Sequence, residues 1–239
     1  MSAAYVLIAS THGVIGVLAL MAFWTAAVVR KGSFLHRRVG RIYLVAMVGI
    51  IATAVPMAAF KYAQARYVTA TFLLYLAVIT ATSLWRAWRA IRDKRDIERY
   101  IGTIYAGLAC LCLISGIAVL VMGIMQRSFL LAGFSAIGIA VGTDMLRIRR
   151  NRVRVAGDSR WWLSEHYSAM LGNGVATHIA FLSIGLPRLL PAVDGATLHY
   201  VAWFGPVVVA LAVKALIDRR GKARAVSTAP SPPRQYAGN

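Results

Sequence analysis

The chain has 239 residues, of which 59% are hydrophobic and only 15% are charged, and its mean hydropathy is +0.65. These proportions exclude an ordinary soluble domain and place the chain in a bilayer. The formal net charge of +19 raises nucleic-acid binding as an alternative, which the distribution of the basic residues has to decide.

Seven apolar stretches are long enough to cross a bilayer as helices, which takes about 20 residues each. In chain order they are residues 3–29, 41–60, 66–88, 101–125, 128–146, 163–186 and 197–217. The first is expected to be a retained helix, because its apolar run is too long for a signal peptide and basic residues follow it instead of preceding it. The sequence therefore predicts an all-α, polytopic membrane protein with seven transmembrane helices in residues 1–218.

The rest of the chain, residues 219–239, is rich in Ser, Pro, Ala and Arg and cannot bury a core. This composition predicts a disordered basic tail.

The basic residues are distributed very unevenly between the two sets of connections. Of the 27 Lys and Arg residues, 23 lie in the first, third and fifth connections and at the C-terminal end, whereas only Lys61, Arg66, Arg127 and Arg188 lie elsewhere. The positive-inside rule then predicts an N-out, C-in protein of the bacterial cytoplasmic (inner) membrane, with anionic lipids at its cytoplasmic face. No nucleic-acid partner is expected, since no aromatic-interleaved basic patch accompanies the charge.

Small residues indicate close helix contacts. Gly138 and Gly142 form a small-xxx-small pair, which predicts tight packing of the fifth helix. Cys110 and Cys112 lie two apart on one helix, so they point to different sides and are expected to act as small core residues.

Two local patterns stand out. The first is Leu-His-Arg-Arg-Val-Gly-Arg-Ile-Tyr at residues 35–43, and the second is His-Tyr-Ser-Ala-Met-Leu-Gly at residues 166–172, continuing to Phe181. Together with His12 and the order of the helices, they resemble a family of bacterial multi-pass membrane proteins that share a domain of unknown function. The resemblance covers most of residues 1–190 and implies no particular reaction.

Polar side chains at membrane depth are costly and usually face a cavity or a partner. His12 and His178 are expected at one depth near the outer face, whereas His36 and His166 are expected near the cytoplasmic face. Two such levels are what a transmembrane di-haem protein needs, because paired imidazoles bind each iron axially. The sequence thus suggests haem b held by these four histidines for transmembrane electron transfer.

A regular helix would place His166 and His178 about 120° apart, which does not suit one haem-facing stripe. A one-residue bulge at Gly172-Asn173-Gly174 would reduce the offset to about 20°. Without a bulge, His166, Met170, Asn173 and Thr177 form a polar stripe that lines a cavity.

Two carboxylates are expected near the inner end of that cavity, Glu165 and Asp144. The alternative for Asp144 is an ion pair with Arg147 or Arg149 at the interface. The simpler interpretation of all these polar residues is hydrogen bonding between helices.

Other chemistries receive less support. A zinc site would combine His12, His178 and His199 with Asp194, but no HxxxH or HExxH pair occurs in the sequence. A proton-coupled carrier usually places carboxylates near the midplane, and here they fall in loops or at helix ends. Lys214 lies too near a helix end to bind retinal. The alternatives to haem are therefore a small-molecule transporter or ligand-binding protein and a zinc-site protein, and the sequence assigns no reaction and no oligomeric state.

Overall fold

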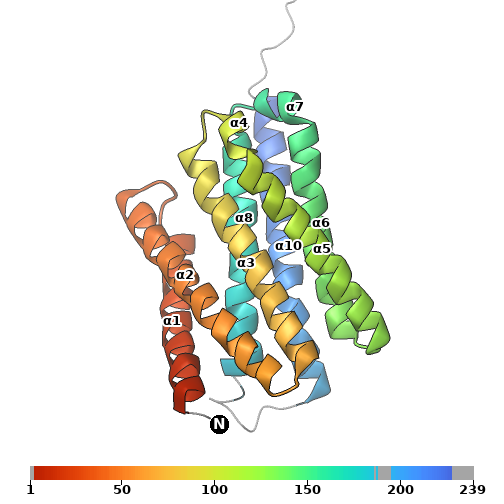
Figure 1. Ribbon diagram of the computed structural model, residues 1–239. Coiled ribbons are helices and arrows are strands. Elements are labelled where there is room, and N and C mark those ends of the chain that lie inside the picture. The colour runs from red at the N-terminus through yellow and green to blue at the C-terminus, as the bar shows by residue number, and fades with distance from the viewer. Residues whose placement is uncertain (1–2, 186, 188–194, 228–239) are drawn as a thin grey trace, which may run out of the picture.

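The computed structural model describes residues 3–185, 187 and 195–227, and within these ranges it is helical throughout, without a strand (Figure 1). The long helices are α1 (Ala3–Val28), α2 (Phe34–Ala63), α3 (Tyr67–Arg92), α5 (Thr103–Met125), α6 (Phe129–Arg150), α8 (Trp161–Ala180) and α10 (Ala196–Ser227). Two short helices, α4 (Ile97–Tyr100) and α7 (Arg152–Ala156), lie close together at one end of the bundle, which we call the α4/α7 end.

Six helices of the described part are long and apolar enough to cross a membrane: α1, α2, α3, α5, α6 and the Leu198–Arg220 part of α10. The shortest of them, α6, rises about 33 Å, which matches a hydrocarbon core of about 30 Å. Large apolar side chains on these helices stay exposed, as at Val14 (72%) and Ile124 (66%), where lipid would cover them. The protein is therefore an all-helical, multi-pass membrane protein, as the sequence predicted.

The sixth predicted crossing, α8, is not among these six helices. It packs against α1, α3 and α10, and it runs alongside α3 through the middle of the bundle (Figure 1). Its buried residues include Glu165, Asn173 and Thr177. Polar residues that face protein lower the hydropathy of a helix without meeting lipid, so α8 is less apolar than its neighbours. The count of seven crossings depends on α8 and stays a prediction.

Several helix boundaries differ from the predicted ones. Helix α2 begins at Phe34, well before residue 41, because the Ser33 hydroxyl caps it by accepting from the His36 backbone N–H. The short helices α4 and α7 lie in stretches that the sequence placed in loops. Helix α10 continues to Ser227, into the range predicted as a tail, and residues 228–239 lie outside the described part.

The small residues of α6 allow close contact with α3 and α5, which confirms the predicted packing role of Gly138 and Gly142. A Cβ on Gly142 would lie 2.7 Å from the Ala109 carbonyl oxygen, and one on Gly138 would lie 2.8 Å from the Tyr75 hydroxyl. That hydroxyl donates to the Phe134 carbonyl (2.6 Å) and accepts from the Gly138 N–H (2.8 Å), so it bridges two groups that a regular helix joins directly. Tyr75 thereby fixes α3 against α6.

The charge distribution makes a topology prediction. Reporter fusions after Arg95 and Arg152, both at the α4/α7 end, should report a cytoplasmic location, and a fusion after Gln126 should report the outside. A fusion after Gln64 serves as a second external control. The reverse pattern, with Gln126 inside, would contradict the orientation.

Candidate functional site

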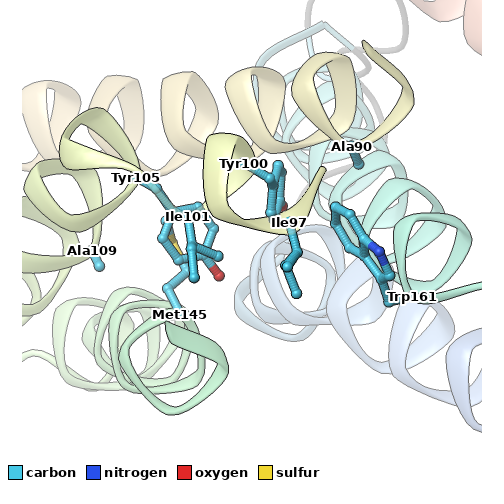
Figure 2. Packing of buried hydrophobic residues seen from close by; sticks show 8 residues of the cluster. All are labelled: Ala90, Ile97, Tyr100, Ile101, Tyr105, Ala109, Met145 and Trp161. Carbon is cyan, nitrogen blue, oxygen red and sulfur yellow. The ribbon is translucent and has the colours of Figure 1, made fainter. Parts of the chain in front are cut away.

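The α4/α7 end contains a compact aromatic cluster. Figure 2 shows the rings of Tyr100, Tyr105 and Trp161 with Ile97 and Ile101 among the helices that meet there, and all five residues are at most 9% exposed. The Tyr100 ring lies 5.0 Å from both the Tyr105 and Trp161 rings, centroid to centroid. Tilted aromatic contacts of this kind stabilise by about 1 kcal/mol each beyond the burial of their area. Because Tyr100 is the last residue of α4, these ring contacts hold the short helix against the buried core at the α4/α7 end.

A buried ion pair lies beneath this cluster. Arg86 of α3 is 5% exposed and Glu165 of α8 is 7% exposed. The guanidinium donates from Nη2 to both carboxylate oxygens (3.0 Å each) and from Nε to Oε2 (3.2 Å). A bidentate arginine–carboxylate pair combines strong attraction with fixed orientation, so it joins α3 and α8 in one register.

Two further side chains interact with this ion pair. The Tyr100 hydroxyl donates to Glu165 Oε2 at 2.6 Å, and Asp144 Oδ2 lies 3.7 Å from Arg86 Nη2. Burial raises the pKa of Tyr100 above its usual range, and the charge of Glu165 raises it further, so the phenol keeps its proton and remains a donor. Asp144 thus faces Arg86 of α3, whereas the sequence offered Arg147 or Arg149 as its partner.

The residues that directly follow Glu165 on α8 and Arg86 on α3 form a second contact between these two helices. His166 follows Glu165, Ala87 follows Arg86, and His166 Nδ1 lies 2.9 Å from the Ala87 carbonyl oxygen. His36, in the first turn of α2, makes the equivalent contact with Ala26 of α1, at 3.1 Å. Each ring is therefore held by a helix other than its own, and these hydrogen bonds do not join the two rings to each other.

The hydrogen bonds of these rings fix their tautomers. A carbonyl oxygen only accepts, so Nδ1 carries a proton in both His36 and His166. In the neutral form of each ring, the lone pair is then on Nε2. A backbone carbonyl on Nδ1 and a free Nε2 is the arrangement found in most metal-binding histidines.

The structure does not bring His12 and His178 together. His12 Nδ1 bonds to Thr53 Oγ1 of α2 (2.8 Å), whereas His178 Nε2 accepts from the Trp24 indole of α1 (3.0 Å). Trp24 lies twelve residues beyond His12, about 18 Å along α1 at 1.5 Å per residue.

The proposed bulge at Gly172-Asn173-Gly174 is wrong, because α8 is a regular α-helix throughout Trp161–Ala180 and π-helical geometry appears only at Phe181–Gly185. His166 and His178 therefore keep their offset of about 120°. The glycines serve packing, since a Cβ on Gly174 would lie 2.5 Å from the Phe23 ring.

The described residues contain no cluster of ligands for the zinc site that the sequence offered as an alternative. His199 is exposed on α10, where its ring contacts Tyr200 and Trp203. In the part of the chain that the structure describes, no three His, Cys, Asp or Glu residues gather as metal ligands. Asp194 lies outside that part.

The other residues of the predicted stripe lie between α2, α3 and α8, where Asn173 and Thr177 are buried and Met170 is partly buried. Met170 packs against the cluster that contains Tyr43 and Met47, and Thr177 Oγ1 lies 3.1 Å from the Tyr43 hydroxyl. Asn173 is completely buried, and neither its Oδ1 nor its Nδ2 has a hydrogen-bond partner among the described residues. A buried amide without partners costs stability and calls for an explanation.

Sequence reasoning missed Arg86 and Tyr100. Arg86 was counted among the loop charges, because a basic residue near a helix end usually extends to the headgroups. The available signal was its position between Trp85 and Ala87 inside a stretch that continues to Arg92 as one helix.

Comparison with known proteins adds no family: no family description, no curated protein and no solved structure is detectably similar to this chain. The resemblance in the loop and helix motifs therefore stays a prediction.

The ion pair yields a stability prediction. Glu165→Gln should lower the free energy of unfolding by about 3 kcal/mol, because it leaves the Arg86 charge buried with only Asp144 nearby. Thermal melting in detergent measures this. The matched control is Glu98→Gln, which breaks the exposed pair with Arg152 and should cost at most about 1 kcal/mol. Equal losses in the two variants would contradict the structural role of the buried pair.

A second prediction concerns Asn173. Asn173→Leu should leave stability unchanged or raise it by about 1 kcal/mol, since it removes a buried amide that has no partner. Thr177→Val should lower stability by about 1 kcal/mol, because it removes the contact with Tyr43. If melting instead shows that Asn173→Leu is the more damaging change, the amide has a partner, and a bound polar ligand becomes the better explanation of the stripe.

Proposed function

We propose that the protein is a seven-pass, N-out, C-in protein of the bacterial inner membrane that holds one haem between His36 and His166 and carries electrons. The observation that supports this proposal is the equivalent position of the two histidines, each of which donates from Nδ1 to a backbone carbonyl of another helix. The excess of Lys and Arg at the α4/α7 end supports its assignment to the cytoplasmic face.

The surroundings of the pair suit a pre-organised ligand set. His166 is positioned by Ala87 of α3, and the adjacent Arg86–Glu165 pair prevents α8 from sliding along α3. His36 is positioned from two sides, since Ser33 caps its backbone N–H and Ala26 accepts from its ring. Both imidazoles are only partly exposed.

A bound haem would supply one-electron redox chemistry at this position. The protein's own contribution would be to present two imidazoles along fixed directions and to limit the access of water. Lys31 adds a positive charge nearby, as its Nζ donates to the carbonyls of Ala26 (2.9 Å) and Ala27 (2.6 Å). Such a cation favours the more negative, reduced form of a nearby redox centre.

A ligand-binding or transport function is the second candidate, and the completely buried, unpartnered amide of Asn173 favours it. A polar ligand that reached this amide would also meet Thr177 and Tyr43, which form the neighbouring hydrogen bond. The melting comparison described above separates this candidate from simple packing.

The haem proposal is tested with full-length protein purified after haem-supplemented expression. An absorption spectrum should show a Soret band, and His36→Ala or His166→Ala should each lower or abolish it, because a haem that loses one of two imidazole ligands is held more weakly. His199→Ala serves as the control, since His199 is exposed on another helix, and it should retain the band.

Absence of a Soret band in the wild-type protein would overturn the proposal. So would a band that is undiminished in both His36→Ala and His166→Ala.

A further inference from the structure

A pocket of about 370 Å³ lies at the α4/α7 end, on the side of the buried ion pair where α6, α7 and α8 meet. This volume falls in the lower part of the range for small-molecule sites. Its polar and aromatic lining consists of Arg147, Asn151, Arg154, Asp158, Trp161, Ser164 and Glu165. None of the residues that would bind haem contributes to it.

The lining of the pocket carries charges of both signs. Arg147 and Arg154, from α6 and α7, form no ion pair among the described residues, so their guanidinium groups remain available to an anion. Asp158 and Trp161, between the end of α7 and the start of α8, also line the pocket. Asp158 Oδ1 accepts from the Arg160 backbone N–H (2.8 Å), which orients the carboxylate and leaves Oδ2 to accept from a ligand.

The indole ring beside Asp158 suits a cation. Trp162, the next residue, already has the Lys94 ammonium over its ring at 5.7 Å, and Arg92 lies over Trp88 at 5.1 Å. Trp161 lines the pocket with only 6% of its surface exposed, so an ammonium group of a ligand that bonds to Asp158 would meet the small exposed part of its indole. The pocket thus offers one place for a phosphate and another for an ammonium.

The pocket also lies where lipid headgroups are found. Tryptophans gather at this end of the bundle, at Trp85, Trp88, Trp161 and Trp162, as in the aromatic belts of membrane interfaces. Val153 of α7 is 82% exposed, and the Arg152–Glu98 pair ties α7 to α4. An exposed apolar side chain beside a charged pocket suits a ligand with both a headgroup and acyl chains.

We propose that this pocket binds an ethanolamine phosphate group, as the headgroup of a zwitterionic phospholipid, with its phosphate on Arg147 and Arg154 and its ammonium on Asp158 and Trp161. Ser164 lines the pocket and adds a hydroxyl that can donate to the phosphate. This assignment does not depend on whether the protein binds haem.

Native mass spectrometry of the full-length, delipidated protein tests the proposal, with phosphatidylethanolamine, phosphatidylglycerol and soluble O-phosphoethanolamine as probes. Phosphatidylethanolamine should be retained best. Arg154→Gln and Asp158→Asn should each weaken its retention roughly tenfold, the effect of losing one charge-assisted hydrogen bond. Arg149→Gln is the matched control, since Arg149 is exposed at the same end of α6 but does not line the pocket.

Phosphatidylglycerol and O-phosphoethanolamine each lack one part of the proposed ligand. They therefore show which part is recognised and whether the ligand is a lipid or a soluble headgroup. Phosphatidylglycerol has no ammonium, so its weaker retention should be insensitive to Asp158→Asn. Displacement of the lipid by O-phosphoethanolamine at equal concentration would show that a soluble headgroup is the ligand, and retention of the lipid would show that the acyl chains contribute. Equal retention of both lipids, or an Arg149→Gln loss as large as that of Arg154→Gln, would overturn the proposal.

Discussion

The ion pair between Arg86 and Glu165 is the interaction on which the α4/α7 end depends. Each buried charge costs several kcal/mol of desolvation, which only good geometry and further hydrogen bonds can offset. Here three contacts from the guanidinium and one from Tyr100 supply that geometry. Because Ala87 and His166 directly follow the paired residues, the same register that satisfies the charges also brings His166 to its carbonyl partner. The pair therefore positions the histidine as well as the helices.

The position of α8 explains why a membrane protein can contain so polar a helix. Its neighbours α1, α3 and α10 replace lipid around it, so its polar residues are buried against protein. The outer helices show the opposite pattern, with exposed Val, Leu and Ile side chains and small residues at their contacts. Polar interiors of this kind are where membrane proteins place cofactors and ligands, because lipid-facing surfaces cannot hold them.

Much of the fold could be predicted from the sequence, because the apolar stretches and the glycine spacing of α6 are local patterns. The partners of the polar residues could not be predicted, since they depend on how α1, α2, α3 and α8 rotate and slide against one another. Equal depth suggested that His12 would meet His178, but Trp24 takes that place. Equal depth also suggested His36 with His166, and there each ring bonds to a backbone carbonyl of another helix, so their pairing stays a prediction. The depth of a residue in the membrane is only one of its three coordinates. Two ligands of one group must also agree in the lateral position of their helices and in the direction in which their side chains point.

We propose that His36 and His166 would hold one haem as its two imidazole ligands. Electron paramagnetic resonance of the oxidised full-length protein, after haem-supplemented expression, tests this most directly. Two imidazole ligands are strong-field donors, so the account predicts a low-spin ferric signal. A high-spin ferric signal, which indicates a single axial histidine, or the absence of any haem signal would contradict it.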